Sequence, residues 1–402
     1  MRNCRLKQLA TIVFSTVDKK TAESEHSVLL CNYTDVYYNE RITPVLTFME
    51  GSASKAEIRR FSLRQGDVLL TKDSETPDDI AASAYVPEDL PGVLCGYHLA
   101  LLRPVEDVDG RYLHWALNAR PVLEQFTTRA NGITRFGLRQ DSVADVRVPV
   151  PSAATQRAIA DYLDTETARI DALIEKKRRM VELLLLRWRM TIDNLVAAQV
   201  NVPLRRLMAS IVDGTHGTYE RLLIGRPLLS AKNLSGGRVV MSEDESLISE
   251  GDYEEIVRSR RFHPGDTLLG VIGGSIGNVA RLRPGDLLAF QRSVACLSPG
   301  SRYYPDFLYF VAQSSQFQAQ MLQAANTSAQ AGVYLDDLAS IVVPLPSLAE
   351  QKVAAATLSF RCEKVNELEV CINEQVSLLQ ERRQGLITAA VTGELDIQGM
   401  AA

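Results

Sequence analysis

Two polar strings in the second half of the sequence carry side chains that bind phosphates or base edges. The first is Asp213-Gly214-Thr215-His216, and the second, Lys232-Asn233, follows an apolar run. Carboxylates, hydroxyls, amides, imidazoles and ammonium groups all occur at protein–DNA contacts. A lone string of the first kind is also typical of a turn whose histidine is satisfied locally. Both interpretations stay open at this point.

A glycine-rich stretch, residues 270–278, follows a run of residues typical of a strand. Glycines let a backbone approach a phosphate group closely. The stretch lacks the Lys-Ser/Thr ending of a P-loop and the spacing of a dinucleotide fingerprint. It therefore predicts a β-turn or a close approach to a nucleic-acid backbone, and it disfavours a nucleotide site.

Arginine and lysine gather at three further places. Residues 129–136 form a polar, glycine-containing loop with two arginines, and residues 175–179 and 187–189 are basic stretches within an otherwise amphipathic segment. The two stretches fit a solvated helix face, or contact with a partner subunit or with DNA phosphates.

Catalytic motifs are missing from the sequence. There is no Asn/Asp-Pro-Pro-aromatic tetrapeptide of an amino-methyltransferase, no Walker A motif, no HExxH and no nucleophile elbow. The sequence therefore predicts a non-catalytic protein that binds no metal or cofactor of its own.

Composition favours a cytoplasmic globular protein of two or three domains. The chain has 402 residues and a net charge of −5, so any binding to nucleic acid needs a focused basic patch or help from partner subunits. No apolar run approaches the roughly 20 residues of a membrane span, and no signal peptide is expected. The six cysteines form no CxxC pair, which favours reduced thiols.

Two long amphipathic segments are expected to position the polar residues described above. Residues 151–200 follow Pro149-Val150-Pro151, with Ser152 as a plausible N-cap, and residues 346–396 follow a similar proline pair 195 residues later. Both keep apolar residues at seven-residue spacing, which favours helix pairing. Each helix of roughly 45 residues would span about 65 Å. The residues that we expect to pair the helices or to dock partners are Leu163, Ile170, Leu173, Leu184, Leu358, Val365, Leu368, Ile372, Leu379 and Leu386.

The segments between these helices also repeat. Residues 1–150 and 201–345 both mix short strands with helices, and Gly66-Asp67 before one strand matches Gly265-Asp266 before another. The chain is therefore a tandem duplication whose helices match best and whose globular interiors match least. Such divergence is expected if the two domains perform the same task on different targets. It is equally expected if the sequences of surface loops have simply drifted.

The chain resembles the specificity subunits of type I restriction-modification systems. The resemblance rests on Pro149-Val150-Pro151-Ser152 with residues 156–174, on Pro344-Leu345-Pro346-Ser347 with Gln351, and on the ending at residues 383–396. The Asp213 string and Ser275-Ile276-Gly277 are similar to patterns in the recognition domains of that family.

The resemblance implies α/β (α+β) target recognition domains in tandem, separated by two long helices that form an antiparallel coiled coil. Each domain would read one half of a bipartite, asymmetric site on double-stranded DNA, and the helices would set the spacer. They would also dock two methyltransferase subunits that use S-adenosylmethionine to methylate adenine. Restriction and translocase subunits that use ATP and Mg are an optional further component. This chain itself would bind no cofactor.

In this interpretation residues 1–150 and 201–345 are the recognition domains, and residues 151–200 and 346–396 are the spacer and docking helices. The expected DNA-binding residues are Thr71, Lys72, Arg129, Asn131, Thr134, Arg135, Thr215, His216, Lys232, Asn233, Ser275, Asn278 and Gln330.

Two other functions remain open on the sequence alone. The chain fits a helical scaffold that binds only proteins, in which case no bipartite DNA motif would be enriched by the assembled complex. It also fits a fused modification enzyme that has lost its catalytic half, which an adjacent methyltransferase reading frame would disfavour.

Overall fold

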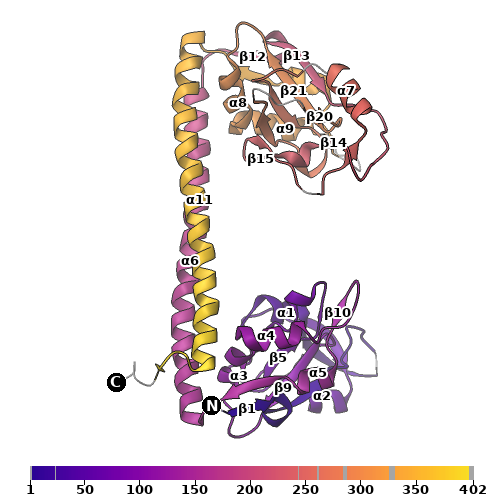
Figure 1. Ribbon diagram of the computed structural model, residues 1–402, viewed down its shortest axis with the longest axis vertical. Coiled ribbons are helices and arrows are strands. Elements are labelled where there is room, and N and C mark those ends of the chain that lie inside the picture. The colour runs from indigo at the N-terminus through magenta and orange to yellow at the C-terminus, as the bar shows by residue number, and fades with distance from the viewer. Residues whose placement is uncertain are drawn as a thin grey trace. The chain divides into compact units, whose positions relative to one another are not determined.

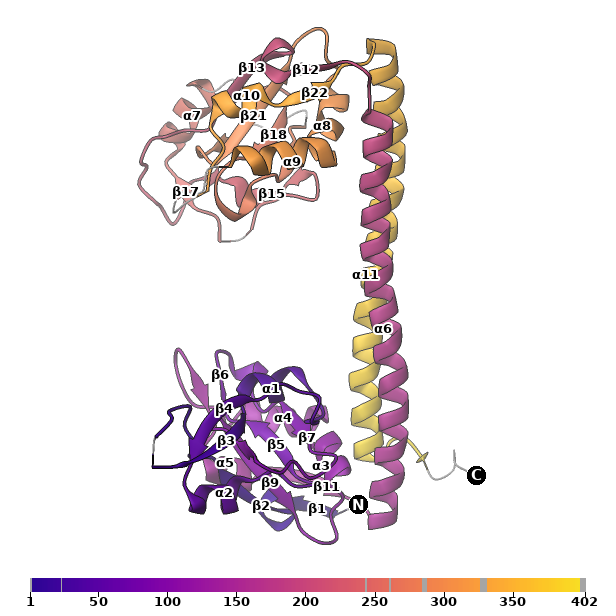
Figure 2. The same cartoon turned by 180° about the vertical axis from the view of Figure 1, so that it is seen from behind.

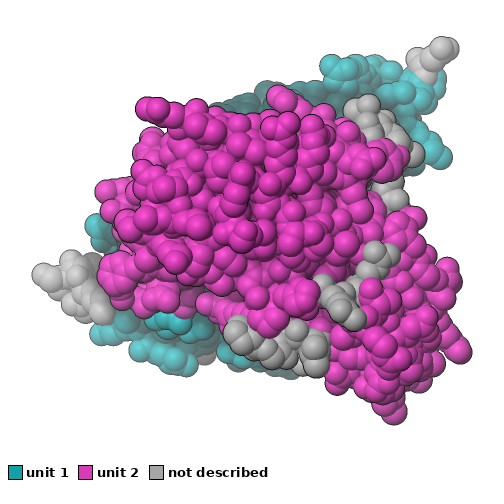
Figure 3. Space-filling model, turned by 90° about the horizontal axis from the view of Figure 1, so that it is seen from above, with its two compact units in different colours: residues 1–177, 374–402 teal, residues 178–373 magenta. Residues whose placement is uncertain are grey.

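The structure is a computed structural model that describes residues 2–22, 24–242, 244–259, 262–283, 288–325 and 331–397. It divides into two compact units, which Figure 3 colours separately. Unit 1 contains residues 1–177 and 374–402, and unit 2 contains residues 178–373. Two long helices, α6 (Ala153–Val196) and α11 (Leu348–Thr392), each contribute one part to each unit.

Both long helices begin where the prolines and serines predict. The Ser152 hydroxyl accepts the backbone N–H of Thr155 at 3.3 Å, which confirms Ser152 as the N-cap. In the second copy the Ser347 hydroxyl accepts the N–H of Glu350, whose carboxylate accepts the N–H of Ser347 at 2.8 Å. This reciprocal capping box satisfies two backbone donors that a helix start leaves without partners.

Within each unit the parts of α6 and α11 lie side by side and antiparallel (Figures 1 and 2). In unit 1, Ile170 and Ile174 pack on Val376, and Asp171 is hydrogen-bonded to Arg383 at 2.9 Å. In unit 2 the buried cluster joins the end of α6 to the start of α11 through Ile192, Val196, Ala354, Ala355 and Leu358. The helix pairing that the seven-residue spacing predicts is therefore present in both units.

The globular part of unit 1 is built on two small sheets. The four-stranded sheet contains, in spatial order, β2 (Ala10–Phe14), β9 (Leu99–Pro104), β5 (Val68–Thr71) and β7 (Ser83–Tyr85). The three-stranded sheet contains β4 (Met49–Ala53), β3 (His26–Cys31) and β8 (Val93–Cys95), with β3 antiparallel to β4 and parallel to β8. Two short pairs complete the unit: β1 (Arg2–Arg5) with β11 (Arg147–Val150), and β6 (Asp73–Ser74) with β10 (Phe136–Gly137). The helices are α1 (Tyr33–Tyr38), α2 (Lys55–Phe61), α3 (Gly110–Leu117), α4 (Arg120–Thr127) and α5 (Gln140–Ala144).

Unit 2 repeats both sheets of this plan and the pair of β1 with β11. Its four-stranded sheet contains β13 (Met208–Asp213), β21 (Val294–Pro299), β18 (Thr267–Gly270) and β19 (Val279–Arg281). Its three-stranded sheet contains β17 (Leu247–Ile248), β14 (Arg226–Leu229) and β20 (Ala289–Phe290), again with one antiparallel and one parallel neighbour. The short pairs are β12 (Asn201–Pro203) with β22 (Val342–Pro344) and β15 (Leu234–Ser235) with β16 (Arg238–Val239). The helices are α7 (Glu250–Ser259), α8 (Pro305–Gln313), α9 (Ser315–Ala324) and α10 (Leu335–Ser340).

The shared topology confirms the tandem duplication that the sequence predicts. In both copies the aligned Asp of the Gly-Asp pair is buried: Asp67 accepts two hydrogen bonds from the Arg103 guanidinium, and Asp266 accepts one from the Ser298 hydroxyl. The frame is thus conserved between the copies while the partners of its buried groups differ. No helix among the described residues is both long enough and apolar enough to cross a membrane.

Candidate nucleic-acid interface

In unit 1 the predicted residues gather around the turn between β8 and β9, residues 96–98. The N–H of Lys72 donates to the carbonyl of His98 at 3.2 Å, and the N–H of Leu138 donates to the carbonyl of Lys72 at 2.8 Å. Pairing of β6 with β10 holds the arginine loop, residues 129–136, beside this segment. Segments about 60 residues apart in sequence therefore meet at one end of the sheet.

Lys72 lies on two aromatic rings at this end. Its ammonium is 4.5 Å from the ring centroid of Tyr97 and 5.2 Å from that of Phe14. Burial lowers the pKa of Lys72, against the opposing effect of Asp73 and Cys95. Tyr97 is 48% exposed. A cation beside an exposed aromatic ring offers both a phosphate contact and a surface on which a base can stack.

The remaining predicted residues of unit 1 differ in their exposure. Arg129 is half-buried and donates to the carbonyl of Gln125, and the exposed Asn131 donates to the carbonyl of Arg129. Thr134 and Arg135 are exposed at the end of the loop. Thr71 is fully buried in β5.

In unit 2 the predicted residues gather around the equivalent turn, residues 291–293, between β20 and β21. The N–H of Arg292 donates to the carbonyl of Thr215 at 3.0 Å. Ser293 accepts the N–H of Ala231 on its hydroxyl and the N–H of Val271 on its carbonyl, at 3.1 and 2.9 Å. The Asp213 string, the Lys232 string and the glycine-rich stretch therefore meet at one place.

Most of the side chains in this second cluster already have partners. His216 is paired with Asp213 at 2.6 Å, and the Thr215 hydroxyl is hydrogen-bonded to that of Tyr219 at 2.6 Å. This pairing fits the turn interpretation of the string, although His216 is exposed. Ser275 is half-buried in the turn that follows β18, and Asn278 donates to the carbonyl of Ala231 at 3.5 Å.

Lys232 and Asn233 share one carboxylate. Asn233 is buried and donates to Glu245, and the exposed Lys232 lies 3.3 Å from the same side chain. Burial raises the pKa of Glu245, but hydrogen bonds from Ser242, Asn233 and Lys232 outweigh that effect and lower it. Gln330 lies outside the described residues.

The glycine-rich stretch is a tight turn between β18 and β19, as predicted. A Cβ on Gly270 would lie 2.1 Å from the carbonyl oxygen of Ser275, and Gly277 has a φ of +87°. Glycine is required at the first position for the close approach and at the second for the backbone conformation. The stretch shapes the end of the sheet where the second cluster lies.

Several exposed residues at these two turns were not singled out by the sequence analysis. Arg292 is exposed at the centre of the second cluster, and Tyr97 takes a similar place in the first. Outside these turns, the apolar residues Ile133, Leu223 and Ile224 have 95%, 99% and 89% of their surface accessible. No local signal distinguishes them, because an apolar run beside a short strand is typical of a core.

Each domain is fixed to its own helix by a buried glutamine. In unit 1, Gln156 accepts the N–H of Asp109 at 3.0 Å and donates to the carbonyls of Asp107 and Pro151. In unit 2, Gln351 accepts the N–H of Tyr304 at 2.7 Å and donates to two equivalent carbonyls. We call these two side chains the glutamine clasps.

A charge network surrounds the clasp of unit 1. Asp164 accepts the indole N–H of Trp115 at 2.9 Å and pairs with Arg41 and Arg111 at 2.9 and 3.3 Å. Arg383 of α11 pairs with Asp171 and with Glu40. The carboxylates of α6 therefore neutralise arginines from the domain and from α11.

His114, behind this network, makes unit 1 sensitive to acid. Burial, with smaller contributions from Arg383 and Arg41, lowers its pKa to about 3, and its Nε2 has no partner among the described residues. The unfolded chain binds a proton near pH 6.5, so stability is lost as pH falls below that value. Between pH 6.5 and pH 5 we expect unit 1 to lose about 2 kcal/mol.

This loss is measured by urea unfolding in a Trp188→Phe background, where Trp115 fluorescence reports on unit 1 alone. In His114→Gln the same pH change leaves the urea midpoint of unit 1 almost constant. An equal acid shift in both proteins would show that His114 does not cause it.

No group of three or more potential metal ligands occurs among the described residues. The clusters at residues 96–98 and 291–293 therefore offer cations, amides, hydroxyls and an aromatic ring, which suit binding to a nucleic acid.

Comparison with known proteins relates part of this chain to a protein family. Residues 231–378 match the family model described as the type I restriction modification DNA specificity domain. This region is a type I specificity domain. The family resemblance predicted from the sequence is thereby confirmed. The matched region includes the clasp Gln351 and most of the second cluster.

The relatives of the specificity domain support this identification. The chain is 22% identical to the EcoBI specificity subunit of Escherichia coli over 309 residues, covering 69% of this chain and 65% of that protein. It is 21% identical to the EcoKI specificity subunit of Escherichia coli K12, covering 83% of this chain and 76% of that protein. The chain thus matches just under two thirds of the length of the EcoBI subunit.

Solved structures share the fold along almost the whole chain. A chain from a study of assembly and conformational transition in the type I R-M system has a TM-score of 0.73 at 16% identity, covering 98% of both chains. The HsdS subunit of Thermoanaerobacter tengcongensis has a TM-score of 0.51 at 17% identity, covering 98% of this chain and 97% of that one. The predicted fold class, tandem mixed domains with a long helical pair, is confirmed.

Proposed function

We propose that this chain is the non-catalytic specificity subunit of a type I restriction-modification system. It reads a bipartite, asymmetric site on double-stranded DNA and directs methyltransferase subunits to that site in the cytoplasm. Residues 1–150 and 201–345 act as the target recognition domains. One observation carries the proposal: in two copies of one fold, polar loops of different sequence gather at equivalent turns.

Direct readout needs exposed donors and acceptors on a rigid frame. The exposed members of the two clusters supply them, together with the half-buried Lys72: Asn131, Thr134 and Arg135 with Tyr97 in unit 1, and His216, Lys232 and Arg292 in unit 2. The negative net charge of the chain makes partner subunits necessary for further neutralisation of phosphates.

The long helices act as the spacer and as the docking surface for two methyltransferase subunits. Leu173 and Leu368 occupy equivalent positions of the two copies and are 42% and 49% exposed. Met180, Leu183 and Leu186 are also exposed on α6. Apolar side chains exposed on a helix favour burial against a helix of a partner. S-adenosylmethionine, ATP and Mg belong to the partner subunits.

Methylation profiling of the host genome, with and without this chain, tests the proposal. We expect adenine methylation at a two-part motif with a fixed spacer, and loss of that methylation when the chain is deleted. A helical scaffold that binds only proteins would leave the methylation pattern unchanged.

Arg135→Ala should relax specificity at one half-site only. Arg135 is exposed on the loop of the first cluster, and loss of a good arginine–base contact costs about 1–3 kcal/mol of discrimination. The measurement is binding of the assembled complex to oligonucleotides that vary each half-site in turn.

Arg292→Ala is the matched control, because it removes an exposed arginine from the second cluster. It should relax the other half-site. If either substitution weakens binding equally for all sequences, that arginine contacts phosphate and does not read bases.

A further inference from the structure

His98 ends the turn at the centre of the first cluster, and Asp73 fixes its imidazole. Nδ1 of His98 lies 2.7 Å from a carboxylate oxygen of Asp73. An ionised carboxylate only accepts hydrogen bonds, so Nδ1 carries the proton between them. Nε2 has no hydrogen-bond partner among the described residues and is accessible to solvent. The protein therefore holds one ring nitrogen of His98 and leaves the other for a ligand.

The surroundings of His98 belong to the candidate interface. Its carbonyl accepts the N–H of Lys72, and its ring packs edge-on against the exposed ring of Tyr97, with centroids 5.1 Å apart. Asp73 pairs with Gly137 in the strand that follows the arginine loop. The second nitrogen of His98 thus lies among the residues expected to contact DNA.

The duplication shows that the fold does not require this pair. Hydrogen bonds that stabilise the frame recur in both copies, as the glutamine clasps do. The strand registers align His98 with Ser293 and Asp73 with Ile272. Isoleucine accepts no hydrogen bond, and the Ser293 hydroxyl accepts the N–H of Ala231 instead. The His98–Asp73 pair therefore belongs to what differs between the two domains.

Unit 2 has a pair of the same kind at its own cluster. Nε2 of His216 lies 2.6 Å from a carboxylate oxygen of Asp213, and 58% of the His216 side chain is exposed. The registers align Asp213 with Phe14 of unit 1, so this pair has no counterpart in the frame either. Both domains therefore place a carboxylate-held imidazole at the candidate interface, from different positions of one fold.

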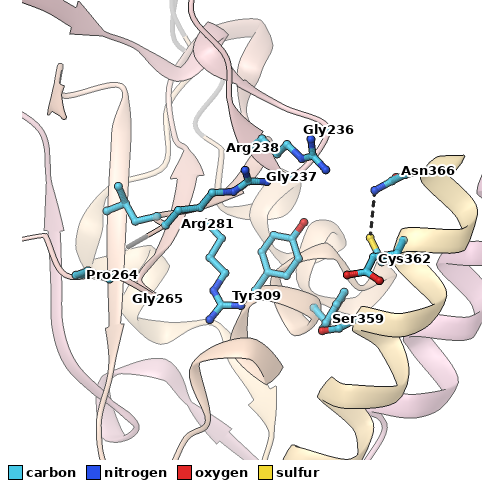
Figure 4. A pocket seen from close by; sticks show the side chains of 14 residues that line it. Gly236, Gly237, Arg238, Pro264, Gly265, Arg281, Tyr309, Ser359, Cys362 and Asn366 are labelled. Carbon is cyan, nitrogen blue, oxygen red and sulfur yellow. Dashed lines mark hydrogen bonds between the residues drawn. The ribbon is translucent and has the colours of Figure 1, made fainter. Parts of the chain in front are cut away.

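The cavity of about 410 Å³ between the domain and α11 of unit 2 contrasts with these pairs (Figure 4). Arg281 there pairs with Asp306, and Asn366 donates to the sulfur of Cys362 at 3.7 Å. These side chains bind other parts of the protein, whereas Nε2 of His98 is left for another molecule.

We propose that Nε2 of His98 accepts a hydrogen bond from the exocyclic amino group of a base in the major groove, with Asp73 as a positioning residue. This inference rests on the proposed function, the reading of double-stranded DNA. When the first nitrogen of a neutral imidazole carries the proton, the second is an acceptor. Adenine and cytosine present amino groups at different places in the groove. An acceptor held in one position therefore distinguishes between base pairs.

Selection from duplexes with randomised half-sites tests the assignment in the complex of the full chain with its methyltransferase subunits. The pH is 8.5, above the range in which histidine usually titrates. His98→Ala should lower the preference at one position of one half-site by about tenfold, because one hydrogen bond to a base is lost. The control, His26→Ala, changes an exposed histidine at the other end of the sheet that contains β8, and should leave the motif unchanged.

Base analogues identify the atom that His98 contacts. At the position that His98→Ala relaxes, adenine is replaced by purine or cytosine by 2-pyrimidinone, each of which lacks the amino group. The analogue should weaken binding by the wild type by about tenfold and binding by His98→Ala hardly at all. Equal losses in both proteins would overturn the proposal.

Asp73 has its own test as a positioning residue. Asp73→Asn keeps an oxygen that accepts the proton of Nδ1, whereas Asp73→Ala removes the acceptor. We expect Asp73→Ala to relax the same position as His98→Ala, and Asp73→Asn to retain the preference. Relaxation spread over several positions would show instead that Asp73 only tethers the arginine loop.

The selection also separates this inference from the proposed function. A wild-type complex that selects no two-part motif contradicts the proposed function itself. A two-part motif that His98→Ala leaves unchanged overturns only the assignment of His98. Selection that persists at the other positions of the same half-site shows that the variant is folded.

Discussion

Leu163→Ala is expected to lower the free energy of unfolding of unit 1 by about 2–5 kcal/mol, the usual range for removing a buried leucine. Leu163 is fully buried in the cluster that joins the first domain to both helices, together with Trp115, Ile387 and Val391. Loss of its side chain leaves a cavity among groups from three parts of the chain. We therefore expect methylation to lose its dependence on the first half-site before it loses its dependence on the second.

Leu173→Ala is the matched control for this prediction. It removes the same side chain from the same helix, but Leu173 is 42% exposed. We expect a change within about 0.5 kcal/mol. Urea unfolding in the Trp188→Phe background measures both variants through Trp115. Similar losses in the two would mean that Leu163 does not hold the domain to the helices.

Gln351→Ala is expected to destabilise unit 2 by about 2–4 kcal/mol. Gln351 is fully buried, and its removal leaves the N–H of Tyr304 and the carbonyls of Arg302 and Pro346 without this partner. Each buried polar group that loses its hydrogen bond costs about 1–3 kcal/mol, and partial entry of water reduces the sum. Hydrogen exchange of peptides from residues 302–313 measures the loss.

Arg361→Ala is the control, because Arg361 is exposed on the part of the same helix that belongs to unit 2. Gln156→Ala extends the test to unit 1, where the clasp has the same three backbone partners in equivalent positions. Each clasp variant should impair recognition of its own half-site. If both variants impair the same half-site, the clasps do not act within separate units.

The repeats and heptads predict the architecture well. Serine and proline at the helix starts, and apolar residues at seven-residue spacing, indicate the two helices and their pairing because local physics decides both. The clasps are visible only as an aligned pair, Gln156 with Gln351, since their hydrogen bonds reach backbone groups more than 40 residues away.

The candidate interface is harder to predict, because sheet topology assembles it. Arg292 and Tyr97 lie in three-residue turns between strands, and only the folded domains show that segments distant in sequence surround these turns. The polarity of a residue in the sequence also does not predict how deeply its side chain is buried. Thr71 and Lys72 are adjacent in sequence, but Thr71 is fully buried and Lys72 only half-buried. The predicted DNA contacts therefore stay predictions.

The composition of unit 1 has a consequence for synthesis on the ribosome. Its core needs Ile387, Ala390, Val391 and Ile397, whereas unit 2 is one continuous segment, residues 178–373. Domains fold as their residues leave the ribosome. Unit 1, whose translation starts before that of unit 2, is thus completed after it, and a message truncated before the codon for Ile387 yields a unit 1 whose core lacks these residues.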